Sequence, residues 1–239
     1  LMYLYDRNKL NLDEELGAYL PALQGTNKEH LRIRDVLAHT SGLRSFLPFW
    51  KYTMDLEEDS VFFYNDRPLT NQSVEVAFGM YGEEWLRDSV WYWTVHSKLR
   101  RKYRSGTYGY RYSDLGFYIL QVLAEKLLQQ PLDHFMDSVF YKPLGMRSMT
   151  FNPLCKFPIQ TIVPTEYDTV FRDVQVWGHV HDPIAAMYGG VAGHAGLFSN
   201  GTDLLKLMQM NLQGGVYADR RYLSEEVIKE FTSKQFNGN

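Results

Sequence analysis

Residues 114–128, DLGFYILQVLAEKLL, carry the clearest periodic signal in the sequence. The apolar positions recur at helical spacing and form one face: Leu115, Tyr118, Ile119, Val122, Leu123 and Leu127. The polar positions lie away from that face: Gln121, Glu125 and Lys126. Pro131 ends the run, because proline cannot continue a helix. The sequence therefore predicts an amphipathic helix over 114–128 that packs on a core.

Shorter helical patterns are expected before and after this helix: residues 1–8, a stretch ending near Pro21, 33–39, 132–140, and the segments that follow Thr202 and Ser224. Thr40-Ser41-Gly42 would end the helix over 33–39, since glycine commonly follows a helix C-terminus. Thr202 would cap a helix that carries Asp203 in its first turn and stops at Gly214-Gly215.

The remaining segments give weaker signals. Residues 45–110 look irregular, with weak helical patterns at 73–80 and 83–100, and residues 150–182 look like loops with short strands. Long alternating strands are scarce, so we expect a mainly helical chain with few short strands.

Composition limits the classes of protein to consider. Hydrophobic residues make up 45% and charged residues 22% of the 239 residues, which is typical of a globular chain that buries a full core. The net charge of −3 gives no reason to expect nucleic acid as a partner. A run of about 18 uncharged apolar residues, which would predict a membrane span, is missing from the sequence. The single cysteine, Cys155, is expected to be a buried or loop thiol.

The two ends resemble interior sequence. LMYLYDRNKL begins with apolar residues at helical spacing and without a capping residue, as in the last turns of a helix, and SKQFNGN stops without a closing element. We therefore expect residues 1–239 to be a single, partial domain taken from a longer protein; the alternative for the start is a genuine N-terminal helix that is frayed.

Tyr112-Ser113-Asp114, at the start of the predicted helix, is the first candidate for chemistry. A serine nucleophile needs a neighbouring base, and a tyrosine phenol can serve near neutral pH only if a cation favours its ionised form. Asp114 could point at the same cleft. The alternative is structural: a buried tyrosine before a helix that Ser113 caps, with Asp114 favouring the positive helix end.

His39-Thr40-Ser41-Gly42-Leu43 could suggest a catalytic His–Ser pair. Neighbours at that spacing rarely reach base-to-nucleophile geometry, so we interpret the segment as a packed turn whose hydroxyls bond the local backbone. Ser41-x-x-Arg44 also lacks an amine that could be neutralised.

His179-Val180-His181-Asp182, with His194 further on, is a possible zinc site. No other ligand cluster supports it, and the alternative is a loop whose histidines bond backbone or carboxylates.

Two further motifs give weak signals. The glycines of 189–196 permit tight turns, but no Lys-Ser/Thr follows them, so nucleotide binding is not expected. The basic run KLRRKYR (98–104) predicts a solvated face, or else a patch for an anionic substrate.

Five stretches together resemble the β-lactamase-related serine hydrolases, which include class C β-lactamases, D-alanyl-D-alanine carboxypeptidases and related esterases. They occur in the family's order: DRNKLNLDEELGAYLP (6–21), IRDVLAHTSGL (33–43), YRYSDLGFYILQVLAEKL (110–127), FYKPLGM (140–146) and GGVAGHAGLFSNGTDL (189–204). VHDPIAAMYGGVAGHAGLFS (180–199) is most similar to bacterial envelope proteins in which this domain follows a glycosidase domain.

The resemblance implies an α+β, β-lactamase/transpeptidase-like fold, with an active site between a helical domain and a sheet built mainly from the two chain ends. Such enzymes use Ser-x-x-Lys, Tyr-x-Asn and Lys- or His-x-Gly motifs. Only the second is matched, with Tyr112 as the proton-transferring tyrosine and Asp114 in place of the usual asparagine. No serine in this chain has a lysine three residues later. The first motif is therefore expected before Leu1 and the third after Asn239, and His194-Ala195-Gly196 is expected to be a turn before a helix.

These expectations lead to three hypotheses. The chain is the central part of a serine hydrolase that acts by acyl-enzyme chemistry on a peptidoglycan peptide, a β-lactam or a small ester, and it has no turnover alone. Alternatively, it belongs to a non-catalytic binding or scaffolding module of the same fold. A zinc hydrolase using His179, His181 and Asp182 is the weakest alternative. The first hypothesis needs no metal or cofactor, and the resemblance implies a location in the periplasm or cell envelope of a bacterium.

Overall fold

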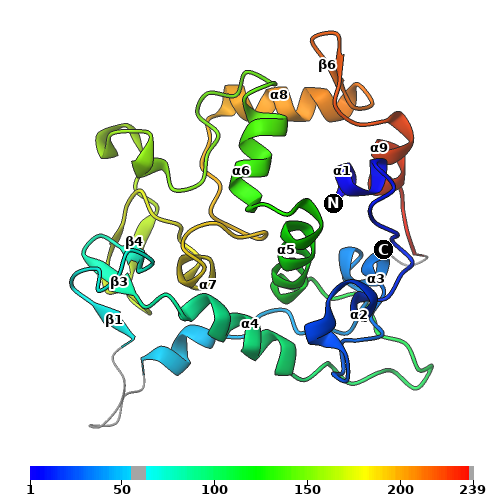
Figure 1. The fold of residues 1–239 in the computed structure, drawn as a ribbon, viewed down its shortest axis with the longest axis horizontal. Coiled ribbons are helices and arrows are strands. Elements are labelled where there is room, and N and C mark those ends of the chain that lie inside the picture. Colours follow the sequence, from blue (N-terminus) through cyan, green and yellow to red (C-terminus); the bar gives the residue numbers. More distant parts are fainter. Residues whose placement is uncertain (55–62, 237–239) are drawn as a thin grey trace. The chain divides into compact units, whose positions relative to one another are not determined.

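The structure, a computed structural model, describes residues 1–54 and 63–236 and contains two compact units (Figure 1). Unit 1 consists of Leu1–Phe46, Val95–Met149 and the described part of 199–239. Unit 2 consists of Leu47–Thr94 and Thr150–Phe198, without the undescribed residues 55–62. That 1–239 form a single domain stays a prediction.

Unit 1 is mainly helical. Its elements, in chain order, are α1 (Met2–Asp6), α2 (Leu16–Tyr19), the 3₁₀ helix η1 (Pro21–Leu23), α3 (Ile33–Leu37), α5 (Asp114–Leu128), α6 (Leu132–Met136), the π-helical turn η3 (Asp137–Tyr141), α8 (Gly201–Leu212), the two-stranded β6 (Val216–Tyr217) and β7 (Arg220–Arg221), and α9 (Glu225–Thr232). α4 (Leu86–His96) begins in unit 2 and ends in unit 1.

α5 confirms the predicted helix at both ends. The Ser113 hydroxyl caps it by accepting the Gly116 N–H at 3.3 Å, and Gln129 ends it in the left-handed conformation with φ of 57°. Gln121 does not lie away from the core as expected, because it is only 3% exposed. Its amide donates to Glu125 Oε1 at 3.2 Å, and the same oxygen accepts the Leu132 N–H, so these polar groups join α5 to α6.

α1 lies beside α5 and α9 in Figure 1 and packs against both. Its residues Met2 and Tyr3 contact a core cluster that includes Phe135, Phe140 and Met210. The Tyr3 and Phe135 rings meet edge to face with centroids 5.0 Å apart, an arrangement that aromatic quadrupoles favour. The apolar opening of the sequence is therefore part of the core of unit 1.

Two predicted helix boundaries are wrong. The helix over 33–39 ends at Leu37, and His39, with φ of 57°, adopts the left-handed conformation before the glycine at 42 is reached. α8 is capped by Asn200, whose side chain accepts the Asp203 N–H at 2.9 Å, and Thr202 lies already inside the helix. Histidine is among the residues that tolerate the left-handed conformation better than most, whereas Asn200 has the extended backbone that is usual for an N-cap residue. The predicted cap of α9, Ser224, is confirmed by its bond from the Val227 N–H.

Unit 2 holds short strands and short helices: η2 (Phe49–Thr53), β1 (Tyr64–Asn65), β2 (Val74–Ala77), β3 (Met80–Gly82), η4 (Pro153–Cys155), η5 (Ile159–Thr161), β4 (Glu166–Asp168), β5 (Val174–Val176) and α7 (Pro183–Met187). One antiparallel sheet has the order β1-β3-β2, and β4 pairs with β5. The helical signal at 73–80 was wrong, since these residues form β2 and the turn into β3, whereas the signal at 83–100 is confirmed by α4.

A buried arginine ties the parts of unit 2 together. The Arg172 side chain is fully buried and donates to Asp168 Oδ2 at 2.7 Å and to the carbonyls of Val76 and Val180 at 3.2 and 2.8 Å; it also donates to the His181 carbonyl. Burial by itself would raise the pKa of Asp168, but the arginine and two backbone N–H groups lower it overall. The positive charge of Arg172 is thus balanced by the Asp168 carboxylate, and the guanidinium also donates to three backbone carbonyls.

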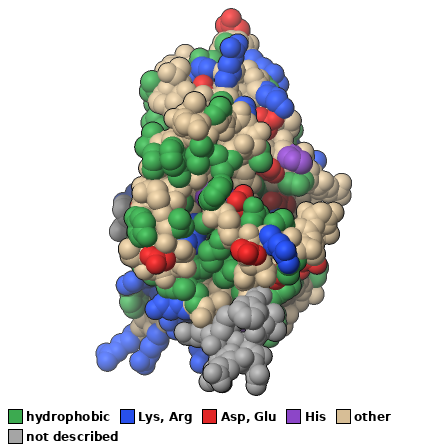
Figure 2. All heavy atoms as spheres, turned by 90° about the vertical axis from the view of Figure 1, so that its left-hand side faces the viewer, with side chains coloured by type: hydrophobic (Ala, Val, Ile, Leu, Met, Phe, Trp, Pro, Cys, Tyr) green, Lys and Arg blue, Asp and Glu red, His purple; other side chains and the backbone are tan. Residues whose placement is uncertain are grey.

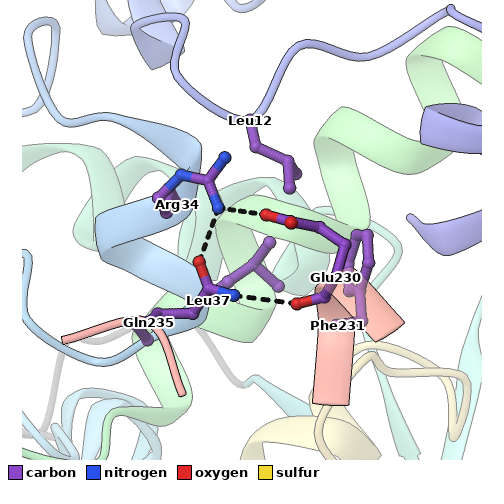
Figure 3. Close-up of a pocket in the computed structure, with 7 residues that line it drawn as sticks. Leu12, Arg34, Leu37, Glu230, Phe231 and Gln235 are labelled. Carbon is purple, nitrogen blue, oxygen red and sulfur yellow. Dashed lines mark hydrogen bonds and ion pairs between the residues drawn. The ribbon is translucent and has the colours of Figure 1, made fainter. Parts of the chain in front are cut away.

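In unit 1 a second arginine, Arg34, joins segments far apart in the sequence (Figure 3). Its guanidinium donates to Asp13 Oδ1 at 2.7 Å, to Gln235 at 2.5 Å and to Glu230. Gln235 Nε2 in turn donates to the Glu230 carbonyl at 2.8 Å. Leu12, Leu37, Ala38 and Phe231 complete a small pocket of about 130 Å³ around this group. The arrangement fastens α3 to α9 through polar contacts.

Hydrophobic side chains are exposed at several places on the face that Figure 2 shows. In unit 2 the most exposed large ones are Phe78, Val163 and Val170, at 79%, 82% and 61%. Among the helices of the described residues, none is both long and apolar enough to cross a bilayer.

Candidate active site

Tyr112 stands directly before α5, and its neighbours on both sides are bonded to one residue, His39. The Arg111 N–H donates to the His39 carbonyl at 2.9 Å, and the Ser113 N–H donates to His39 Nδ1 at 3.3 Å. The phenol is 51% exposed, so it is not the buried tyrosine of the structural alternative. The backbone on both sides of Tyr112 is thus fixed, and the residue as a whole is half exposed.

The contacts continue along the turn that follows His39. The Ser113 hydroxyl donates to the Arg44 carbonyl at 2.6 Å, and the Asp114 N–H donates to the Ser45 carbonyl at 2.8 Å. The segment 39–45 therefore acts as a template for the start of α5. Gly42 permits the turn, since its φ is 86° and a Cβ there would lie 2.6 Å from the Tyr108 ring.

Aromatic rings surround the imidazole of His39. The Tyr112 ring lies nearest, with centroids 4.6 Å apart and planes inclined by 45°, and the rings of Phe117 and Tyr110 follow at 5.6 and 6.1 Å. The Tyr112 ring is therefore positioned by its contact with the His39 ring, in addition to the hydrogen bonds of the neighbouring backbone.

The electrostatics keep Tyr112 neutral. Burial, then the Asp114 carboxylate, then Tyr110 raise the pKa of its phenol above the usual value near 10. Burial lowers the pKa of His39, and an N–H donated to Nδ1 likewise requires that nitrogen to be unprotonated. Tyr112 would need a cation from elsewhere before it could act as a base near neutral pH.

A polar pocket of about 660 Å³ adjoins this segment. Thr40, Ser41 and Tyr110 line it together with residues of the loops 30–35 and 102–109. Thr40 Oγ1 donates to the Asp35 carbonyl at 3.4 Å and Ser41 is buried, which confirms a packed turn at 39–43 in place of a His–Ser catalytic pair. The sequence analysis considered His39 only as the base of a His–Ser pair, and no local pattern connects it with Tyr112, because the two residues lie 73 positions apart.

The histidines of the possible zinc site, His179, His181 and His194, each pair with a different carboxylate. His179 Nε2 lies 3.5 Å from Glu75, His181 pairs with Glu166, and Asp182 pairs with His194 at 2.9 Å. Burial opposes the charge of Asp182, but His194 and the N–H groups of α7 lower its pKa overall. Within residues 1–54 and 63–236, no group of three or more His, Cys, Asp or Glu side chains could hold a metal ion. The structure does not bring His179, His181 and Asp182 together.

The other candidate motifs have structural surroundings. Cys155 is an exposed thiol at the end of η4, so it is a loop thiol and not a buried one. In the glycine-rich segment, Gly190 and Gly196 have φ of 81° and 103°, and a Cβ at Gly196 would lie 2.2 Å from the Gly190 carbonyl oxygen. His194-Ala195-Gly196 lies in this turn before α8, as expected.

The basic run 98–104 is partly used for structure. Arg100 donates to the carbonyls of Leu43 and Gly109 at 3.1 and 2.7 Å, and the Lys102 ammonium lies over the Tyr108 ring. Arg101 and Arg104 are exposed. The run therefore supports the segment 39–45 and also presents charge to solvent.

Residues 1–239 match the Beta-lactamase family over their whole length. The chain belongs to this family. Solved structures agree on the fold: 95% of the chain aligns with a putative beta-lactamase from Bacteroides dorei at a TM-score of 0.58 and 20% identity, covering 50% of that chain. A penicillin-binding protein homologue from Caulobacter crescentus aligns over 99% of this chain and 58% of its own, at a TM-score of 0.60 and 15% identity. The predicted β-lactamase/transpeptidase-like α+β fold is confirmed.

Curated relatives are more similar in sequence. A protein of Escherichia coli K12 named putative D-alanyl-D-alanine carboxypeptidase is 31% identical over 252 residues, which cover 98% of this chain and 52% of the relative. A protein of the same name from Salmonella dublin is 29% identical over the same shares. The chain thus spans about half the length of the curated relatives that it matches.

Proposed function

We propose that this chain is the central part of a serine hydrolase in which Tyr112 transfers protons and Asp114 orients the substrate or a lysine. The observation that carries the proposal is the fixed, half-exposed tyrosine at the start of α5, in a Tyr-x-Asp sequence that resembles the family's Tyr-x-Asn motif. The nucleophilic serine and its lysine would come from sequence outside residues 1–239, because no Ser-x-x-Lys occurs in this chain.

The proposed reaction is acyl transfer in two steps. The serine oxygen bonds to the carbonyl carbon while the bond to the leaving group breaks, and the serine proton passes through Tyr112 to the leaving nitrogen or oxygen. Water then attacks the acyl-enzyme and returns a proton to the serine. The lysine is essential to this scheme, since its charge would offset the three influences that raise the pKa of Tyr112.

The substrate class follows from the relatives. Proteins named D-alanyl-D-alanine carboxypeptidase favour a peptide of the peptidoglycan stem, with a β-lactam or a small ester as alternatives. With such a substrate, the full-length protein would act in the bacterial envelope or periplasm. A glycosidase domain preceding this one, as the segment 180–199 suggests, would act on the same polymer.

The test compares Tyr112→Phe with Tyr110→Phe in the full-length protein. Both tyrosines are exposed, at 51% and 58%, and both contact His39, so Tyr110→Phe is a matched control. We expect Tyr112→Phe to reduce acylation by a fluorescent penicillin and release of D-alanine from a stem peptide by about 10²–10⁴-fold, the range for loss of a general acid–base. Tyr110→Phe should stay near the parent. If Tyr112→Phe acylates as fast as the parent, the assigned role is wrong.

The non-catalytic module remains the competing proposal, favoured by the missing Ser-x-x-Lys. The full-length protein would then be acylated by neither penicillin nor an activated ester, whatever residue stands at position 112. Sequence upstream of Leu1 without a Ser-x-x-Lys would support the module.

A further inference from the structure

His39 accepts backbone hydrogen bonds from the residues on both sides of Tyr112. Its carbonyl accepts the Arg111 N–H and its Nδ1 accepts the Ser113 N–H, while the rings of His39 and Tyr112 lie 4.6 Å apart. The left-handed backbone of His39, with φ of 57°, turns the carbonyl and the imidazole of one residue toward the same short segment.

We propose that His39 is a positioning residue for Tyr112, acting through the hydrogen bond that its Nδ1 accepts from the Ser113 amide. The inference rests on the proposed function of Tyr112. Other contacts hold the helix start itself: the Ser113 hydroxyl and the Asp114 N–H bond to the Arg44 and Ser45 carbonyls. The imidazole is therefore not needed to form α5, and its bond sets the direction in which the phenol leaves the backbone.

The hydrogen bond fixes the chemical state of His39. Because Nδ1 accepts, its proton must be on Nε2 and the ring must be neutral. Nδ1 cannot itself serve as the base that the His39-Thr40-Ser41 motif suggested. The imidazole instead acts indirectly: it binds the amide of Ser113, the residue that follows Tyr112.

Two substitutions separate the hydrogen bond from the backbone conformation. Asparagine and glycine both tolerate a positive φ, so His39→Asn and His39→Gly should both keep the turn. Asparagine places its Oδ1 the same number of bonds from the backbone as Nδ1, and can accept the Ser113 N–H; glycine offers no acceptor. Both variants lose the ring, which makes the acceptor the difference between them.

In the full-length protein we expect His39→Gly to lower kcat about 10–100-fold with little change in KM, since a displacement of about 1 Å at a reacting group can cost ~10²-fold. His39→Asn should recover most of the loss. Equal kcat in the two variants, at matched unfolding temperatures, would overturn the inference. So would a parent-like kcat in His39→Gly while Tyr112→Phe is inactive. If Tyr112→Phe is itself fully active, the proposed function fails instead.

A spectroscopic measurement on residues 1–239 does not depend on activity. Two-bond proton–nitrogen NMR correlation of the histidine rings should show His39 as the neutral Nε2–H tautomer, identified by the resonance missing from His39→Asn. A protonated Nδ1 at neutral pH would contradict the proposed bond.

Discussion

Lys28 is a buried cation in a chain whose other lysines reach solvent more readily. Its side chain is fully buried, and Nζ donates to Asn27 Oδ1 at 2.9 Å and to the carbonyls of Val95 and Ser97 at 2.9 and 2.6 Å. Burial lowers the pKa of this ammonium from 10.5 to about 8, although three acceptors surround it. The folded state therefore binds this proton less tightly than the unfolded chain does.

The consequence is a stability that increases with pH. Below about pH 8 the ammonium is charged in both states and its burial opposes folding; between about 8 and 10.5 the folded state loses the proton first, so the free energy of unfolding rises. Urea unfolding followed by tryptophan fluorescence should show this rise in the parent and not in Lys28→Met. The exposed Lys229→Met is the control and should keep the parent's slope. Parallel pH profiles for Lys28→Met and the parent would contradict the prediction.

Asp114 acts on Tyr112 through its charge. Since the carboxylate is one of the groups that raise the pKa of the phenol, Asp114→Asn should lower that pKa toward its ordinary value. An NMR titration of ring-labelled tyrosine in residues 1–239, with the Tyr112 signal assigned by Tyr112→Phe, measures the shift. Asp133→Asn, which changes a carboxylate near Tyr141 instead, should leave the Tyr112 titration unaltered. An unchanged Tyr112 titration in Asp114→Asn would show that the carboxylate does not act on the phenol.

At the scale of elements, α8 offers a direct test of the corrected cap. Asn200 accepts the Asp203 N–H and its amide also donates to Ser148 Oγ at 2.9 Å. Asn200→Ala should cost about 0.5–2 kcal/mol of stability, as for other N-caps, whereas Thr202→Ala should cost only a few tenths. Chemical unfolding of both variants measures the difference. A larger loss for Thr202→Ala would favour the cap expected from the sequence.

α5 and β2 show how far the sequence could predict the fold. α5 was predictable because its apolar period, its Ser113 cap and its end near Pro131 agree within one local segment. β2 was not, because a four-residue strand is defined by its pairing with β3 and not by its own pattern. The candidate site shares this limit: Tyr112 could be singled out by a local motif, but its partner His39 is 73 positions away, and only folding brings the two rings together.

The contacts of Arg172 predict a large effect within unit 2. Arg172→Met removes the guanidinium from Asp168 and from three carbonyls, and leaves a 5%-exposed carboxylate without its cation. Breaking a buried pair from one side costs about 3–5 kcal/mol, so the variant should unfold at much lower urea concentration. Arg67→Met, at an exposed site of the same unit, should change stability by no more than about 0.5 kcal/mol. Similar urea midpoints of unfolding for the two variants would mean that the contacts of Arg172 do not stabilise unit 2.

At the scale of the whole molecule, the family was identifiable because its motifs keep their order along the chain. The stretches 6–21, 33–43, 110–127 and 140–146 lie in unit 1, and 189–204 runs from unit 2 into unit 1. Each motif therefore reports a local backbone geometry, such as the turn 39–45 or the start of α5, that a homologous fold must reproduce. The proposed chemistry is less local, since Tyr112, whose pKa is raised, would need a cation to act as a base, and no Ser-x-x-Lys in this chain supplies one.

This dependence predicts different behaviour for the chain and for the full-length protein. Residues 1–239 alone should fix Tyr112 as described and yet form no acyl-enzyme, because the proposal assigns both the nucleophilic serine and the lysine that would let Tyr112 act as a base to sequence outside them. Mass spectrometry after incubation with penicillin should find one added acyl group on the full-length protein and none on residues 1–239. The adduct should map to a serine outside this chain and decrease in Tyr112→Phe. An adduct on a serine within 1–239 would place the nucleophile here and overturn the division of roles, since a residue such as Ser41 or Ser113 would then have to leave its buried position to react.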